Sequence, residues 1–125
     1  MPPFNTSDLK ILIVDDEASF RKLAESALSK RGFSVHLAEA GEEAIAKIYY
    51  EGPQIVLLDV MMPRLTGDEL VKMIKQWKPE IRVFMVTSHL SKDIEEDCLQ
   101  NGANGCFEKP LDFDRFVDSV KQSLQ

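Results

Sequence analysis

Five short apolar runs alternate with helical patterns along the whole chain, and this alternation restricts the fold more than any other feature. Two runs, "ILIV" and "IVLL", are apolar throughout, as is typical of strands buried on both faces. Strands that alternate with helices predict a parallel sheet covered by helices on both sides. We therefore expect an α/β fold, a doubly wound sheet of five parallel strands with five helices. The expected strands are Lys10–Val14, Ser34–Ala38, Ile55–Leu58, Val83–Val86 and Gly105–Phe107.

Helical periodicity marks the residues that should face the core between these strands. Apolar side chains spaced by three and four residues share one face of a helix. Three segments show this spacing clearly. They are Phe20, Leu23, Ala24, Ala27 and Leu28 in the first, Leu70, Met73, Ile74 and Trp77 in the third, and Phe113, Phe116, Val117, Val120 and Leu124 in the last.

Glycines and polar caps mark where the helices should begin and end. Gly32, Gly52 and Gly102 each follow a helical pattern and suit the left-handed conformation of a C-cap. Thr66 and Glu69 have the spacing of a capping box at the start of the third helix.

Composition excludes several classes of protein. The chain has 125 residues, of which 44% are hydrophobic, enough for the core of one domain. We expect residues 1–8 to be a flexible N-terminal tail and residues 9–125 to be that domain. A net charge of −6 without a basic stripe argues against direct binding of nucleic acid or anionic membranes. No run is long enough to span a membrane and no signal peptide is present, so we expect a cytoplasmic protein.

Adjacent carboxylates follow the first apolar run, at Asp15 and Asp16. Two carboxylates about 5 Å apart repel each other by about 3 kcal/mol at an effective dielectric constant near 20. A group of opposite charge should offset this repulsion, because otherwise the two side chains would be better placed apart.

Further polar residues follow the other expected strands. Asp59 comes after the third strand in "LLDVMMP", Thr87 after the fourth in "VTSH", and Lys109 after the fifth in "FEKP". In a doubly wound sheet, the loops at the carboxyl ends of the strands form the binding site. We therefore expect three carboxylates, a hydroxyl and an ammonium group to converge at one edge of the sheet.

The motifs "VDDE", "LLDVMMPRLTG", "VTS" and "EKP", in this order and spacing, resemble the receiver domain of bacterial two-component response regulators. The resemblance extends over residues 9–124 and implies a flavodoxin-like sheet with strand order 2-1-3-4-5. It also implies that Asp59 is the phosphoacceptor. Asp15 and Asp16, with Asp59 and the backbone carbonyl of Met61, would hold Mg²⁺ or Mn²⁺.

The same resemblance assigns roles to residues on the last two strands. Thr87 and Lys109 would contact the phosphoryl group, Lys109 would pair with Asp59 at rest, and the Lys109–Pro110 bond would be cis. A Mg²⁺ ion would offset the repulsion between the carboxylates, since it prefers oxygen ligands and retains several waters.

The function that the resemblance implies is a switch in signalling. A sensor histidine kinase or phosphotransfer protein would donate a phosphoryl group to Asp59, and the modified domain would change its binding to a downstream effector that the sequence does not identify. Such a domain is not an enzyme with a separate substrate, and assists only its own phosphotransfer and dephosphorylation.

Three alternatives compete with this interpretation. A phosphatase with an aspartate nucleophile would carry a second acid two residues after Asp59, where this chain has Met61. A flavin carrier of similar topology would need a loop rich in Ser, Thr and Gly after the first strand, where this chain has "DDEAS". A degenerate receiver would bind partners without phosphorylation, although every expected chemical group is present here.

One position departs from the family pattern. Most receivers carry Tyr or Phe three residues before the lysine, and this chain has Cys106 there. Because neighbours along a strand point to opposite faces, Phe107 should lie in the core on the other side of the sheet from Cys106. We also expect Cys98 and Cys106 to be small apolar side chains rather than members of a disulfide framework or metal site.

Overall fold

A computed structural model describes residues 9–125, so the expected flexible tail at residues 1–8 lies outside the described residues. Five strands form one parallel sheet in the order β2-β1-β3-β4-β5, which confirms the predicted fold class. The elements alternate without exception. In chain order they are β1 (Lys10–Val14), α1 (Ala18–Lys30), β2 (Ser34–Ala38), α2 (Gly41–Glu51), β3 (Ile55–Asp59), α3 (Gly67–Trp77), β4 (Arg82–Thr87), α4 (Lys92–Gln100), β5 (Gly105–Glu108) and α5 (Phe113–Ser123).

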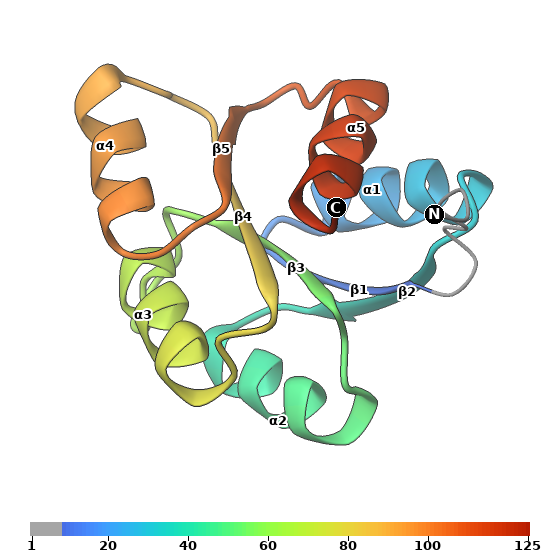
Figure 1. The fold of residues 1–125 in the computed structure, drawn as a ribbon, viewed down its shortest axis with the longest axis horizontal. Helices are drawn as coiled ribbons and strands as arrows, with labels where there is room; N and C mark the ends of the chain where they lie inside the picture. Colours follow the sequence, from blue (N-terminus) through green and yellow to red (C-terminus); the bar gives the residue numbers. More distant parts are fainter. Residues whose placement is uncertain (1–8) are drawn as a thin grey trace.

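Helices cover both faces of the sheet and divide the core in two (Figure 1). Helices α1 and α5 pack on one face, through side chains such as Phe20 and Phe116. Helices α2, α3 and α4 pack on the other, through Ile48, Leu70 and Cys98. None of the helices within residues 9–125 is long and apolar enough to cross a membrane.

The two central strands explain the uninterrupted apolar runs. In β1, Leu12 and Val14 belong to the core under α2 and α3, whereas Ile11 and Ile13 belong to the core under α1 and α5. Strand β3 alternates in the same way and is buried along its whole length. Each central strand therefore needs an apolar side chain at every position, and not only at every second one.

The helical faces agree with the sequence prediction except at their margins. In α1, Phe20, Ala24 and Leu28 are buried as predicted, but Leu23 is 55% exposed and its predicted burial is wrong. The three buried residues recur every four positions and already cover the sheet, and Leu23 is rotated away from them by about 100°. In α3, Met73 and Trp77 are each 43% exposed at the rim of the core, so only Leu70 and Ile74 of the predicted face are buried.

The predicted helix ends are confirmed. Gly32, Gly52 and Gly102 have φ angles of 96°, 61° and 106°. The Thr66 hydroxyl accepts a hydrogen bond from the Glu69 backbone N–H at 3.3 Å, which caps α3.

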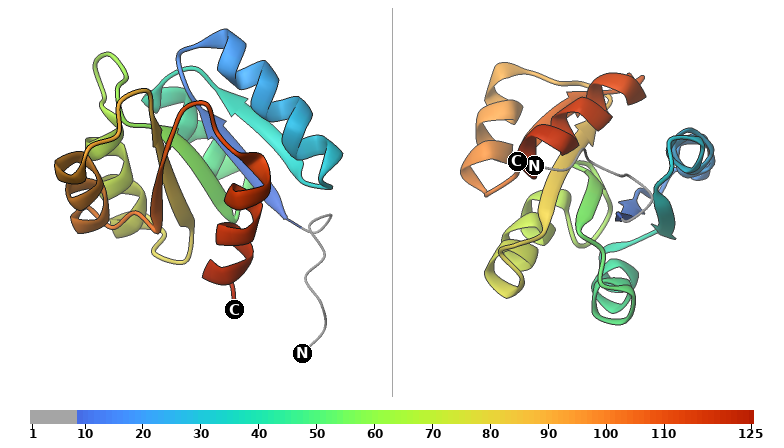
Figure 2. Two further views of the ribbon diagram at one scale, coloured as in Figure 1. Left: turned by 90° about the horizontal axis from the view of Figure 1, so that it is seen from above. Right: turned by 45° about the vertical axis from the view of Figure 1, so that its right-hand side comes forward.

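Strands β3, β4 and β5 each run one residue further toward the site than predicted. Asp59 and Thr87 are therefore the last residues of β3 and β4 and not the first residues of loops. The loops that follow the strands gather at one edge of the sheet, uppermost in the left view of Figure 2. The ladder hydrogen bonds thus fix the backbone of both residues at this edge.

Glycine begins both α2 and α3, but the two glycines face different surroundings. A Cβ atom on Gly67 would lie 2.3 Å from the backbone oxygen of Asp59, and the Gly67 N–H already donates to the Val60 oxygen at 3.2 Å. A Cβ atom on Gly41 would lie 2.4 Å from the Leu65 side chain. The start of α3 therefore rests directly on the backbone of β3, which only a residue without a Cβ atom permits.

We predict that Gly67→Ala lowers the free energy of unfolding by about 3 kcal/mol, because the new methyl group displaces backbone. Gly41→Ala is the comparison variant and should cost about 1.5 kcal/mol, since Leu65 Cδ2 can rotate away and only a small shift of Leu65 relieves the 2.9 Å approach to its Cβ atom. Urea denaturation followed by circular dichroism measures both. Equal costs for the two variants would contradict the close approach of α3 to β3.

Candidate functional site

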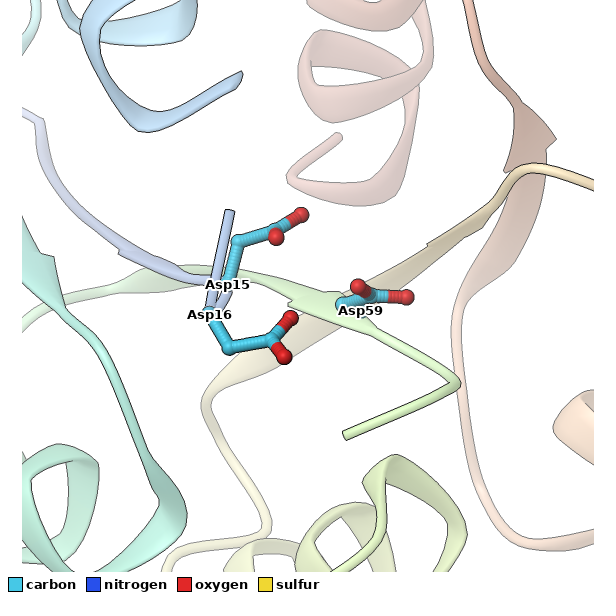
Figure 3. A group of neighbouring side chains, drawn as sticks. All are labelled: Asp15, Asp16 and Asp59. Atoms are coloured by element: carbon cyan, nitrogen blue, oxygen red, sulfur yellow. The ribbon is translucent and has the colours of Figure 1, made fainter. Parts of the chain in front are cut away.

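Three carboxylates converge at the carboxyl ends of β1 and β3. One oxygen each from Asp15, Asp16 and Asp59 lies within 4.8 Å of the others. Figure 3 shows Asp15 and Asp16 directly after β1 and Asp59 at the end of β3, with their carboxylates turned to the same side. The structure therefore brings together the acidic residues that the sequence placed at separate strand ends.

The buried member of the first pair is Asp15. Its side chain has no exposed surface, whereas Asp16 is exposed. The Asp15 Oδ1 atom accepts a hydrogen bond from the Glu17 N–H at 2.8 Å, and its backbone N–H donates to the Ala38 oxygen of β2 at 3.1 Å. The adjacent carboxylates thus differ in environment, one fixed inside the site and the other free to meet solvent or a ligand.

Asp59 is also buried, with 6% of its surface exposed. Its Oδ1 atom accepts a hydrogen bond from the Met61 N–H at 3.0 Å. Burial, followed by the negative charge of Asp15, raises the pKa of the Asp59 carboxyl from 3.8 to about 6, against the opposing effects of the Met61 N–H and the Lys109 ammonium. Desolvation and like charge therefore make the ionised form of Asp59 unfavourable unless a cation is near.

Lys109 supplies a cation from the loop after β5. Its Nζ atom lies 2.8 Å from Asp15 Oδ2, 3.1 Å from Glu17 Oε1 and 3.7 Å from Asp59 Oδ2. Burial lowers the pKa of the ammonium, but the hydrogen bonds to Asp15 and Glu17 outweigh burial and the pKa is raised. The expected pairing with Asp59 is thus the longest of the three contacts, because Asp15 and Glu17 hold the ammonium on the β1 side of the site.

The "VTS" and "EKP" motifs complete this edge of the sheet at the ends of β4 and β5, and the cis peptide bond in the second agrees with expectation. Thr87 is buried at the end of β4, and its backbone oxygen accepts from the Lys109 N–H at 2.8 Å, which links the two loops. Among residues 9–125, its Oγ1 atom accepts one long hydrogen bond, from the His89 N–H at 3.4 Å. The Lys109–Pro110 peptide bond is cis.

A cleft of about 680 Å³ opens above these residues. The exposed Met61 side chain, 71% accessible, stands at its rim. Its walls combine charged and polar groups with two apolar side chains: they are Asp16, Glu17, Asp59, Met61, Thr87, Ser88, His89, Ile94 and Lys109.

Sequence reasoning missed two residues that shape the site. Glu17 shares the Lys109 ammonium with Asp15, and its place in the acidic run "DDE" was the available signal. Gly67 lets α3 approach the Asp59 backbone. Its place at the end of "PRLTG" was a weaker signal in the sequence. Neither contact follows from the sequence alone, because each joins segments whose separation only the folded chain defines.

The family model described as "Response regulator receiver domain" matches residues 11–121, nearly the whole described chain. The chain belongs to the response regulator receiver domain family. A receiver domain of this family is a signalling domain.

Individual relatives agree with this family. The chain is 36% identical to sporulation initiation phosphotransferase F of Bacillus subtilis over 92% of its own length and 93% of that protein. It is 33% identical to the DNA-binding transcriptional regulator NtrC of Salmonella typhimurium over 91% of its length, but spans only 24% of that protein. Among solved structures, a CheY-like receiver domain protein from Methanospirillum hungatei superposes with a TM-score of 0.85 at 28% identity, covering 93% of each chain.

The donor set of this receiver domain fits a hard divalent cation. Three carboxylates present oxygen atoms on one side of the site, and Mg²⁺ prefers oxygen ligands and needs few of them from the protein. The cluster is also short of positive charge, since the ammonium of Lys109 is shared among Asp15, Glu17 and Asp59. A divalent ion would offset both the burial and the negative charge of Asp15, which together raise the pKa of Asp59.

We predict that Asp59→Asn stabilises the metal-free protein. A carboxyl with a pKa raised to about 6 binds its proton more tightly when folded, so its stabilising effect is present in acid and is lost as pH rises from about 4 to 6. At pH 7.5 with a chelator, the variant should be about 2 kcal/mol more stable to urea, and the difference should vanish near pH 3, below the ordinary pKa of 3.8.

Two controls accompany this measurement. Asp118→Asn, on the exposed side of α5, should change stability by less than about 0.5 kcal/mol at either pH. Adding Mg²⁺ should narrow the difference between wild type and Asp59→Asn, because the ion stabilises the wild type by binding its folded form. A variant less stable than wild type in chelator at pH 7.5 would contradict the raised pKa.

Proposed function

We propose that this receiver domain accepts a phosphoryl group on Asp59 from a phosphohistidine of a sensor histidine kinase or phosphotransfer protein, in a Mg²⁺-dependent reaction. The observation that carries the proposal is the environment of Asp59. A buried carboxylate ends a central strand beside two further carboxylates and an ammonium, and it faces an open cleft. One relative is itself named a phosphotransferase.

Each residue contributes a step that its position supports. Asp15, Asp16 and Asp59, with the Met61 carbonyl, would hold the ion, which supplies charge compensation for the phosphoryl oxygens when bound. An oxygen of Asp59 attacks phosphorus in line. The new P–O bond forms as the P–N bond breaks, and the bonding electron pair returns to the imidazole nitrogen.

Lys109 would balance part of the negative charge on the phosphoryl oxygens of the product. Its ammonium already lies 3.7 Å from Asp59 Oδ2, so a small movement away from Glu17 would bring it to a phosphoryl oxygen. Such preorganised cations are worth most in a buried site, where little rearrangement is needed during the reaction.

Thr87 would report the modification to the surface. Its buried hydroxyl has one weak partner at rest, the His89 N–H at 3.4 Å. A phosphoryl oxygen is a stronger acceptor, so the hydroxyl would turn toward it and draw the loop between β4 and α4 with it. We propose that this movement changes the binding of a downstream effector in the cytoplasm.

The alternatives find less support. A degenerate receiver would lack a reactive group, yet Asp59, Lys109 and Thr87 all lie at the site. A phosphatase would need an acid two residues after Asp59, and that position holds Met61, whose side chain is exposed. A flavin carrier would need a phosphate-binding loop after β1, and the three acidic residues there would repel a phosphate.

Treatment with acetyl phosphate and Mg²⁺ should add one phosphoryl group to the intact mass. Asp59→Asn should add none, because an amide oxygen at this position is a poor nucleophile. Asp16→Asn is the comparison variant, and it should slow the reaction without moving the modification to another residue. Undiminished phosphorylation of Asp59→Asn would contradict the assignment.

Mg²⁺ affinity should separate the two adjacent carboxylates. Asp16 is exposed and free to reach the ion, whereas Asp15 is held by Glu17 and Lys109. We therefore expect Asp16→Ala to abolish binding at millimolar Mg²⁺ and Asp15→Ala to weaken it less. Amide NMR shifts are the better measurement, because Trp77 lies at the far end of α3, about 15 Å along the helix from Gly67. Unaltered affinity in both variants would count against this metal site.

A further inference from the structure

The only two cysteines of the chain lie side by side, outside the acidic cleft. Cys98 is in α4 and Cys106 is in β5, and their Sγ atoms are 3.6 Å apart. Both are free thiols. A disulfide needs the sulfur atoms about 2 Å apart, a change that small side-chain rotations can supply when two thiols already touch.

Cys98 is also the point where α4 rests on the sheet. Of the nine residues of α4, it is the one that is fully buried. It packs in the same core as Met85 of β4 and Ala103, with Ile94 and Cys106 partly buried against them. Most of the remaining side chains of α4 are charged or polar and exposed. The helix is thus held to the sheet largely through the thiol that faces β5.

Cys106 is the accessible member of the pair. It is half-buried and lines a second cleft, of about 600 Å³, between the β4–α4 loop, β5 and α5. As alternation predicted, Phe107 points to the opposite face, where it packs against Phe84 and Phe116 with ring centroids 6.2 and 5.6 Å away, although it is only half-buried. The thiol at position 106 therefore meets solvent through this cleft, which α5 and the β4–α4 loop border.

We propose that Cys98 and Cys106 form a redox-sensitive pair that hydrogen peroxide converts to a disulfide joining α4 to β5. The Cys106 thiolate attacks one peroxide oxygen, the O–O bond breaks, and a sulfenic acid and water result after proton transfer. The Cys98 thiol loses its proton and attacks Cys106 Sγ, which expels a second water. Two thiols are oxidised by two electrons in total, and one peroxide is reduced to two waters.

The surroundings make this oxidation slow and dependent on pH. Burial raises the pKa of both thiols, to about 12 for Cys98, and the hydrogen bond between them lowers that of Cys106 while raising that of Cys98 further. The carboxylates that face the pair, Asp68 of α3 and Glu95 and Asp97 of α4, disfavour the thiolates too. Cys106 therefore ionises first, and the pair responds to sustained oxidation more than to brief exposure.

The consequence for signalling rests on the proposed function. If phosphorylation of Asp59 acts through Thr87 on the β4–α4 loop, a disulfide that ties α4 to β5 would oppose the movement of α4. Neither thiol lines the acidic cleft, so oxidation should leave the acceptance of the phosphoryl group unchanged. The disulfide would thus weaken the effect of phosphorylation on effector binding without preventing phosphorylation of Asp59.

Mass spectrometry tests the pair directly. Peroxide treatment at pH 8.5 should remove two hydrogen atoms from the monomer, and dithiothreitol should restore them, whereas methionine oxidation adds oxygen that dithiothreitol does not remove. Both cysteines fall in one tryptic peptide, residues 93–115, because the Lys109–Pro110 bond resists trypsin.

Cys98→Ser should leave a sulfenic acid on Cys106 that dimedone traps, and Cys106→Ser should leave Cys98 reduced. Disulfide-linked dimers, or two thiols that persist in the folded protein but oxidise when it is unfolded, would overturn the proposal.

Hydrogen exchange tests the effect on α4. Amides of residues 92–100 should exchange about tenfold more slowly in the oxidised protein than in the reduced one, while the double variant Cys98→Ser/Cys106→Ser should not respond to peroxide. Unchanged exchange in a protein shown to carry the disulfide would overturn the link to α4. Acetyl phosphate labelling of the oxidised and reduced forms distinguishes the two proposals, because failure of both forms to accept phosphate contradicts the proposed function and leaves the disulfide result intact.

Discussion

The site depends on how few cations its carboxylates share. Asp15 and Asp59 are buried at the ends of neighbouring strands, and the Lys109 ammonium lies between them while also contacting Glu17. The parallel sheet creates this crowding, because it brings the carboxyl ends of all its strands to one edge. The carboxylates of the site repel one another in the absence of a metal ion. A divalent cation bound among them would reduce this repulsion.

The sequence predicted the order of elements well because the signals are local and redundant. The central strands need apolar residues on both faces, and "ILIV" and "IVLL" supply them without interruption. Left-handed glycines and the Thr66 cap confirm the helix ends. Helix margins were less predictable, as Leu23 shows, because the width of a buried stripe depends on how closely the neighbouring layer packs.

The sequence predicted which side chains gather at this edge of the sheet, but not which contacts they make with one another. Asp15, Asp16, Asp59, Thr87 and Lys109 all lie where strand order and the resemblance placed them. The preference of Lys109 for Asp15 over Asp59 was not foreseen, since it depends on differences of about an ångström between loops that are distant in sequence. The contact between the two cysteines likewise depends on how α4 settles on β5.

Because Gly67 lies so close to the Asp59 backbone oxygen, the α3 side of the site has less freedom to move than the α4 side. On the α3 side, backbone rests on backbone and leaves no slack to absorb a displacement. On the α4 side, a helix with a single fully buried residue faces the same cleft through Ile94. If a group enlarged the Asp59 side chain, α3 could not move away, because its backbone already contacts that of β3. Helix α4 is held by fewer buried residues, so we expect any displacement to occur on the α4 side.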